Sequence, residues 1–132
     1  MSRRAGGAGR GLLAPPASPE RGAVTAETAV VLPVLIAVAM GLTWLISIGV
    51  TKVRVVDAAR ETARAVAREE PRAQAIQLGG RIAPEHSRFS VVNQGKTVRV
   101  LVTADVPGPG GLFRFLPVVQ VDAEAVTATE VP

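Results

Sequence analysis

The sequence predicts an α+β protein with a long N-terminal helix, a short second helix and a small three-stranded antiparallel sheet. Three observations predict this fold class. An uncharged apolar run extends from Thr28 to Thr51, a helical pattern of small apolar residues follows it, and the last third of the chain alternates with a period of two. With 132 residues, the chain has material for one domain.

The apolar run predicts a membrane-spanning first half of the long helix. As a helix, residues 28–51 extend for roughly 36 Å, and the hydrocarbon of a bilayer is ~30 Å thick. Pro33 lies inside the run and is tolerated there, because neighbouring groups in a spanning helix compensate for the lost backbone hydrogen bond. Trp44 also lies inside the run and is interpreted as a packing residue.

The run divides the chain into three segments. Residues 1–22 are rich in Gly, Pro and Arg and are expected to form a disordered basic leader. Residues 23–51 form the transmembrane helix, and residues 52–132 form an extracytoplasmic domain whose first part, residues 52–70, continues the helix. In that continuation Val55, Ala59, Ala63 and Ala67 recur every four residues and give one apolar face.

The rest of the domain is predicted to be a short helix followed by a sheet. Residues 72–82 are assigned to the second helix, and strands are expected at about 89–92, 97–106 and 118–127, the first two joined by a turn at residues 93–96. Val98, Val100 and Val102 share one face. So short a chain buries little surface, and the sheet must therefore pack on the second half of the long helix.

Composition excludes several classes of function. The net charge is +4 and the pI about 11.0, but Arg3, Arg4, Arg10 and Arg21 lie in the leader, and nearly no aromatic residues accompany them. Nucleic-acid binding is therefore not expected. Cysteine is absent, His86 is the single histidine, and the acids lack metal-ligand spacing. We expect no catalytic residues, no metal, no cofactor and no enzymatic activity.

The border between leader and apolar run carries the strongest motif. There a basic leader ends in Gly22, Ala23 and Glu27 follow, and the long apolar helix begins. This arrangement resembles the type IV prepilin junction, which implies cleavage by a prepilin peptidase between Gly22 and Ala23. It also implies a role for Glu27 in assembly, and a type IV pilin-like fold. From the residues alone, Glu27 also suits the first turn of a helix, where a carboxylate interacts favourably with the helix dipole.

Over a longer stretch, TAETAVVLPVLIAVAMGLTWL followed by VVDAARETARAVAR resembles the TadE-like minor pilins of tight-adherence pilus systems, particularly their actinobacterial branch. Thr28 stands where the major pilins of these systems have an aromatic residue. The resemblance therefore implies a minor pilin-like protein, or pseudopilin, with a function in cell adhesion. Whether it enters the filament or only assists assembly stays open.

The resemblance also implies partners and a location. The partners are membrane lipid, other pilin or pseudopilin subunits, the prepilin peptidase and the inner-membrane assembly machinery. The protein would lie in the cytoplasmic membrane as a single-pass protein, with its N-terminus inside and its C-terminal domain extracytoplasmic, or at the cell surface or in the pilus after assembly. Counting basic residues does not decide the orientation, because both flanks of the run carry several.

Two alternatives remain on the residues alone. The chain could be an uncleaved single-pass protein with a small extracytoplasmic interaction module, indifferent to Gly22 and Glu27. It could also be secreted, with a signal peptide cut after Ala37-Val38-Ala39. Against secretion, the apolar run continues well beyond Ala39.

Overall fold

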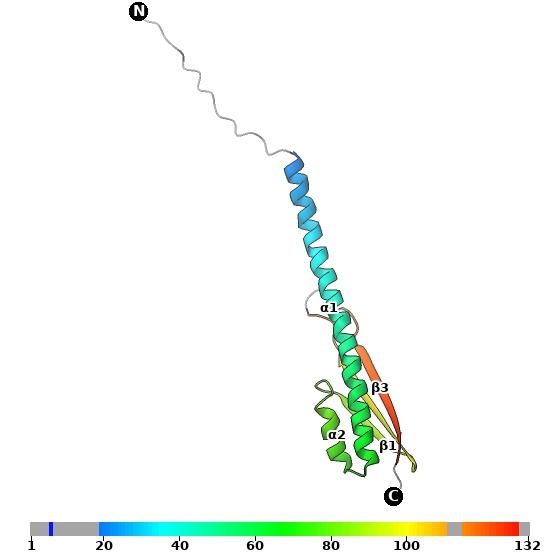
Figure 1. The fold of residues 1–132 in the computed structure, drawn as a ribbon. Helices are drawn as coiled ribbons and strands as arrows, with labels where there is room; N and C mark the ends of the chain where they lie inside the picture. Colours follow the sequence, from blue (N-terminus) through cyan, green and yellow to red (C-terminus); the bar gives the residue numbers. More distant parts are fainter. Residues whose placement is uncertain (1–5, 7–18, 111–114, 130–132) are drawn as a thin grey trace, which may run out of the picture. The chain divides into compact units, whose positions relative to one another are not determined.

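A computed structural model describes residue 6, residues 19–110 and residues 115–129. It contains the helices α1 (Pro19–Ala67) and α2 (Arg72–Gly80) and the strands β1 (Arg88–Asn93), β2 (Thr97–Val106) and β3 (Val119–Ala128) (Figure 1). The three strands form one antiparallel sheet in the order β1-β2-β3. This arrangement confirms the predicted α+β, pilin-like fold class. The chain forms two compact units, Met1–Ile36 and Ala37–Pro132.

The N-terminal end of α1 differs from the sequence expectation. The helix begins at Pro19, so the last four residues of the segment expected to be disordered, up to Gly22, are helical. The physical reason is local: proline suits the first helical position because it has no N–H to satisfy, and Glu20 in the first turn interacts favourably with the helix dipole. The remainder of that segment, apart from residue 6, lies outside the described residues.

The C-terminal end of α1 comes at Ala67, before the expected residue 70. Glu69 has a φ of 66°, its N–H donates to the Val66 carbonyl at 3.0 Å, and the Glu70 N–H donates to the Ala65 carbonyl at 3.1 Å. This pair of bonds is a Schellman motif, which satisfies carbonyls that the helix end leaves free. Because Pro71 follows, Glu70 is disfavoured in the helical region, and the chain must leave the helix here.

The core of the second unit lies between α1 and the sheet. Val98, Val100 and Val102 of β2 are fully buried, as their shared face predicted. They pack in one cluster with α1 residues of the small apolar face and with residues of the flanking strands: Val55, Ala58, Ala59, Ala63, Val91 and Ala123. Small side chains on α1 let the sheet approach the helix closely, which explains how a chain so poor in aromatic residues builds a packed core.

The second helix packs at one special position. α2 ends at Gly80 rather than at the expected residue 82, and Gly79 within it is buried. A Cβ added at Gly79 would lie 2.0 Å from Thr62 Oγ1, 3.0 Å from the Ala58 carbonyl oxygen and 3.0 Å from Phe89 Cε1. Gly79 therefore marks a close approach of α2 to α1 that no residue with a side chain allows. At Gly80 an added Cβ meets nothing within 4 Å.

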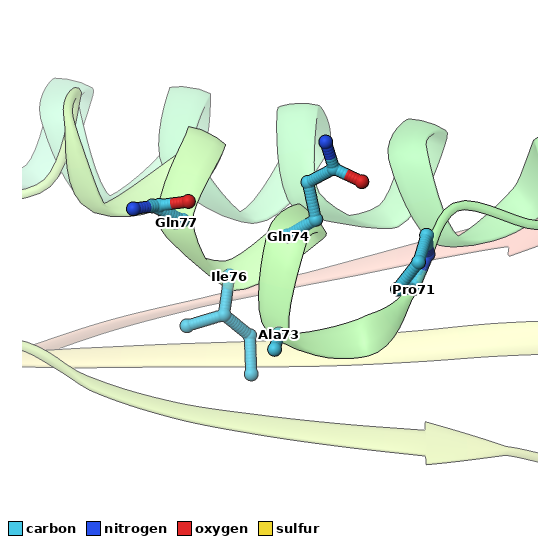
Figure 2. Close-up of a pocket in the computed structure, with 5 residues that line it drawn as sticks. All are labelled: Pro71, Ala73, Gln74, Ile76 and Gln77. Carbon is cyan, nitrogen blue, oxygen red and sulfur yellow. The ribbon is translucent and has the colours of Figure 1, made fainter.

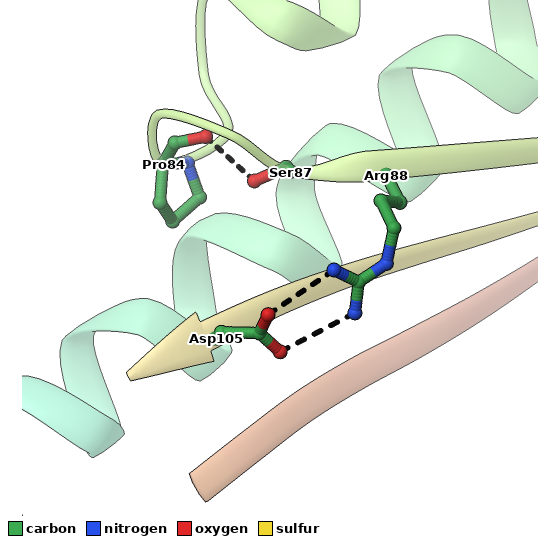
Figure 3. A network of polar contacts seen from close by, with 4 residues as sticks. All are labelled: Pro84, Ser87, Arg88 and Asp105. Atoms are coloured by element: carbon green, nitrogen blue, oxygen red, sulfur yellow. Dashed lines mark hydrogen bonds and ion pairs between the residues drawn. The ribbon is translucent and has the colours of Figure 1, made fainter. Parts of the chain in front are cut away.

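The outer face of the sheet is polar and carries diagonal ion pairs. The Arg88 guanidinium donates to both carboxylate oxygens of Asp105, at 3.1 and 3.3 Å (Figure 3). Arg99 pairs with Glu124 at 3.3 Å. The hydrogen bond from Arg88 holds the pKa of Asp105 below its usual value. These exposed pairs are screened by water, so they mark the solvent face rather than stabilise the fold strongly.

Candidate functional site

The N-terminal part of α1 has the surface of a membrane-spanning helix. Its most apolar 18-residue window has a mean hydropathy of 2.5, and none of that window is buried against the rest of the chain. It is the one helix among the described residues that is long and apolar enough to cross a membrane. Exposed apolar side chains such as Val30, Leu35 and Ile46 cover it, which argues against a core helix of a soluble protein.

The hydroxyl groups in this part of α1 are satisfied within the helix itself. Each donates to the carbonyl four residues earlier, at 2.8 to 3.0 Å, which the structure shows for Thr25, Thr28, Thr43 and Ser47. In lipid, where water cannot serve as partner, this bond removes most of the cost of a hydroxyl. The few polar residues of the apolar run are therefore compatible with a bilayer.

The junction residues lie in the first turns of α1. Gly22 and Ala23 are helical and exposed, and a Cβ added at Gly22 would meet nothing within 4 Å. Glycine in a helix costs roughly 0.5–1 kcal/mol relative to alanine. Nothing in the described fold compensates for this cost, so the fold itself does not require glycine at position 22.

Glu27 follows Ala23 by four residues and therefore lies on the same side of the helix, one turn further on. It lines a shallow groove together with Thr28 and with apolar residues of the neighbouring turns, Val24, Val31, Leu32 and Leu35. It is the only charged residue between Ala23 and Thr51. The structure thus gives Glu27 an exposed position on an otherwise apolar helix surface.

Two basic residues directly after the apolar run have structural partners that the sequence did not reveal. The Lys52 ammonium donates to the Asp122 carbonyl of β3. Arg54 Nε donates to the Ile82 carbonyl at 3.1 Å. Both bonds tie the helix to the folded domain just where the charged part of α1 begins. Sequence reasoning missed them because each partner is a backbone carbonyl distant in the chain, for which no residue pattern exists.

The part of the chain that the structure describes offers little for catalysis or metal binding. No group of three or more acidic, histidine or cysteine residues lies together there. A hollow on α2 is lined by Pro71, Ala73, Gln74, Ile76 and Gln77, with Ile76 pointing toward the strands and the Gln74 amide away from them (Figure 2). These side chains supply neither a nucleophile nor an acid or base. His86 is exposed in the loop before β1.

The fold and this surface define a class: a pilin-like protein built on an apolar N-terminal helix, associated with the membrane. Comparison with protein families narrows the class, because residues 22–64 match the family described as TadE-like protein. The match covers most of α1 from Gly22 onward, and in this part the chain is similar to TadE-like proteins. No curated protein and no solved structure matches the chain. The assignment to the actinobacterial branch stays a prediction.

TadE-like proteins are structural, pilus-associated proteins rather than enzymes. The family therefore supports pilin or pilus subunits as partners and an association with the membrane. The expected site residues, Gly22, Ala23 and Glu27, all lie on the exposed N-terminal part of α1. Their roles in processing and assembly stay predictions.

Proposed function

We propose that this protein is a minor pilin-like subunit of a tight-adherence pilus system, cleaved by a prepilin peptidase between Gly22 and Ala23. One observation carries the proposal. The family match begins at Gly22, and from there to Ile36 α1 presents an exposed, largely apolar surface interrupted by the single charge of Glu27. A helix that only anchors a domain gains nothing from a carboxylate on its lipid-facing surface.

Gly22 has two roles in this proposal: the peptidase recognises it, and it lets the helix unwind at the bond that is cleaved. A peptidase needs an extended substrate, and this bond lies four residues into a helix. The first four N–H groups of a helix have no partner within it, so opening the segment from Pro19 to Gly22 breaks few hydrogen bonds. Glycine lowers the helix propensity further. The residue thus weakens the helix at the point where the chain must unwind.

Glu27 acts after cleavage. On insertion scales a carboxylate in the centre of a membrane helix costs ~2.5–3.5 kcal/mol. Cleavage creates a free α-amine on Ala23, which can neutralise Glu27 of a neighbouring subunit. Because this pairing satisfies both charges at only one relative height of two helices, it fixes their register during assembly.

The orientation that we propose places the N-terminus in the cytoplasm and the folded domain outside. The structural partners of Lys52 and Arg54 support it, because these two bases on the C-terminal flank are held by backbone carbonyls of the domain. They have a role in the fold independent of topology. The basic residues of the N-terminal segment would then be the positive charges that keep this end of the chain in the cytoplasm during membrane insertion.

The test of the proposal is a pair of neutral amide variants on one helix. Glu27→Gln is expected to be processed and retained in the membrane, while its recovery in sheared pili, or the number of pili that it supports, falls strongly. Glu20→Gln is the matched control, because Glu20 is also exposed and helical but lies in the segment that cleavage removes. Wild-type assembly by Glu27→Gln would contradict the proposed role of Glu27.

A further inference from the structure

The sheet leaves a row of backbone groups open along the free edge of each outer strand. In an antiparallel sheet, the residues of an outer strand alternate between bonding the neighbouring strand and pointing away from it. The Thr129 N–H donates to the Lys96 carbonyl at 2.8 Å, which directs odd-numbered residues of β3 toward β2. The Gln94 N–H donates to the Thr97 carbonyl at 2.8 Å, which directs even-numbered residues of β1 toward β2. The open groups therefore belong to even-numbered residues of β3 and to odd-numbered residues of β1.

These two edges have little protection against a further strand. Natural edge strands are often blocked by prolines, bulges or inward-pointing charges, and neither β1 nor β3 contains any of these. Lys52 bonds one open group, the Asp122 carbonyl, but a carbonyl oxygen accepts two hydrogen bonds. In the described part of the chain, the open groups of Glu124 and Val126 have no hydrogen-bond partner. The edge of β3 is thus a template for another strand.

The direction of α1 restricts how two copies can join. β3 runs in the same direction as the part of α1 that belongs to the folded unit, from Ala37 onward (Figure 1). Because β1 is parallel to β3, antiparallel pairing of two copies through any of these edges reverses one α1 relative to the other. Copies that share one membrane in one orientation cannot be arranged in this way. Parallel pairing leaves both helices pointing to the same side.

Hydrogen-bond geometry then selects the edges. A two-fold axis along the strands places each residue beside its own copy, so N–H faces N–H and a symmetric parallel pair forms no ladder. In a parallel ladder, a residue that bonds through both its groups lies opposite one whose groups point away. Even-numbered residues of β3 therefore lie opposite even-numbered residues of β1 in the next copy. In both strands these side chains face outward, so the outer faces of the two sheets match.

We propose that β3 of one copy pairs in parallel with β1 of the next and extends the sheet from subunit to subunit. One register, with Arg88 opposite Asp122, also sets Val92 opposite Val126, which are 45% and 55% exposed in the single chain. Asp122 has no ion pair within the described residues, and the Arg88 guanidinium has donors beyond those given to Asp105. Such charged and apolar cross-strand pairs stabilise a sheet.

The same register satisfies the open backbone groups. Glu124 exchanges bonds with Phe89 and Val91 of the next copy, and Val126 exchanges bonds with its Val91 and Asn93. Within the described part of one chain, the open groups of Phe89 and Val91 have no partner either. The contact joins two different edges and is therefore heterologous, so it continues from copy to copy instead of closing as a dimer.

This contact presupposes the proposed membrane anchorage and common orientation, so the test reports on both. The chain contains no cysteine. Val92→Cys and Val126→Cys, carrying different C-terminal tags, are co-expressed and oxidised in native membranes. Leu101→Cys replaces Val126→Cys in the matched control, because Leu101 is 37% exposed on the same outer face but lies on the central strand β2.

The expected result is a disulfide-linked dimer of Val92→Cys with Val126→Cys. The yield should fall to background for either variant alone and for Val92→Cys with Leu101→Cys. Equal yields for one variant alone would indicate a symmetric contact and overturn the proposed pairing. Absence of the mixed dimer from membranes that hold both variants would overturn it too, while the size of the monomer on the same blot still reports removal of the leader. Loss of both variants from the membrane fraction would overturn the anchorage as well.

A second set of variants tests the backbone bonds. Ser90→Cys and Glu124→Cys are opposite each other in the same register and should also give a mixed dimer. Adding Val126→Pro to Glu124→Cys removes an open N–H but no bond within the sheet, whereas Val126→Thr keeps that N–H. The mixed dimer should be lost with proline and retained with threonine. A dimer retained with proline would overturn the pairing of β3 with β1.

Discussion

Replacing Gly79 by alanine should destabilise the folded domain through one contact between α1 and α2. The new methyl group would lie 2.0 Å from Thr62 Oγ1 and 3.0 Å from the Ala58 carbonyl oxygen. Thr62 cannot rotate away freely, because its side chain is fully buried and its hydroxyl donates to that same carbonyl at 2.8 Å. The helices must therefore separate, and overpacking of this kind typically costs about 1–3 kcal/mol.

Gly80→Ala is the matched control for this prediction. It lies in the same helix, and an added Cβ there meets nothing within 4 Å. Alanine favours a helix over glycine by up to about 1 kcal/mol at either position, so this gain largely cancels in the comparison. The difference between the two variants then isolates the overpacking cost of about 1–3 kcal/mol.

The assay is thermal unfolding of full-length protein in detergent micelles, followed by circular dichroism. For a domain of this size, each kcal/mol shifts the midpoint by roughly 4–8 °C. Gly79→Ala should therefore melt well below Gly80→Ala, and Gly80→Ala at or above wild type. Equal midpoints for the two variants would refute the close approach of α2 to α1 that the structure shows.

Three further predictions concern the junction, the sheet and the end of α1. Gly22→Ala should retain the leader in an immunoblot, while Gly41→Ala, which also gains a Cβ in open space, is processed normally; equal processing would contradict recognition of Gly22. The lowered pKa of Asp105 means that its stabilising contribution is present above the unfolded value near 3.8 and is lost as the pH falls through the lower folded value. Urea midpoints of wild type and Asp105→Asn should therefore converge in acid, and a constant gap would refute the assignment. Glu69→Gly should raise the free energy of unfolding by up to about 1 kcal/mol, and with it the thermal midpoint, because glycine adopts the φ of 66° without strain. A lowered midpoint would argue against the Schellman motif at the C-terminal end of α1.

The fold was largely predictable because its elements have strong periods. Val55, Ala59 and Ala63 recur every four residues, and apolar residues alternate with polar ones around Val100. These two patterns predicted which face of α1 meets which face of β2, and these residues form the core. Even the turn before β2 followed from its residues, since Gly95 adopts a φ of 75° there. Local pattern carries this information without knowledge of the tertiary structure.

Other features depend on contacts between distant segments and leave no pattern. Glycine disfavours a helix by its propensity alone, whereas at Gly79 the lack of a side chain is what lets α2 approach Thr62. The bonds of Lys52 and Arg54 to backbone carbonyls are likewise set by how the folded domain lies on α1. They could not be derived from spacing alone.

For the candidate site, in contrast, the sequence identified the residues, and the structure added only their surroundings. Gly22, Ala23 and Glu27 were identified from sequence and resemblance, and the structure adds their helical setting and exposure. The chemistry that we propose for them requires a peptidase and a neighbouring subunit. Among the described residues, nothing requires glycine at position 22 for steric reasons, and Glu27 lines only a shallow groove on α1 itself. The proposed roles in processing and assembly must therefore be tested in the membrane.

The most direct test of the central claim is the intact mass and N-terminal sequence of the protein purified from its native membrane. We expect a mature chain that begins at Ala23, and a full-length chain when the prepilin peptidase is deleted. A chain that retains residues 1–22 in the presence of the peptidase would contradict it, and a chain that begins at Met40 would identify the apolar run as a cleaved signal peptide.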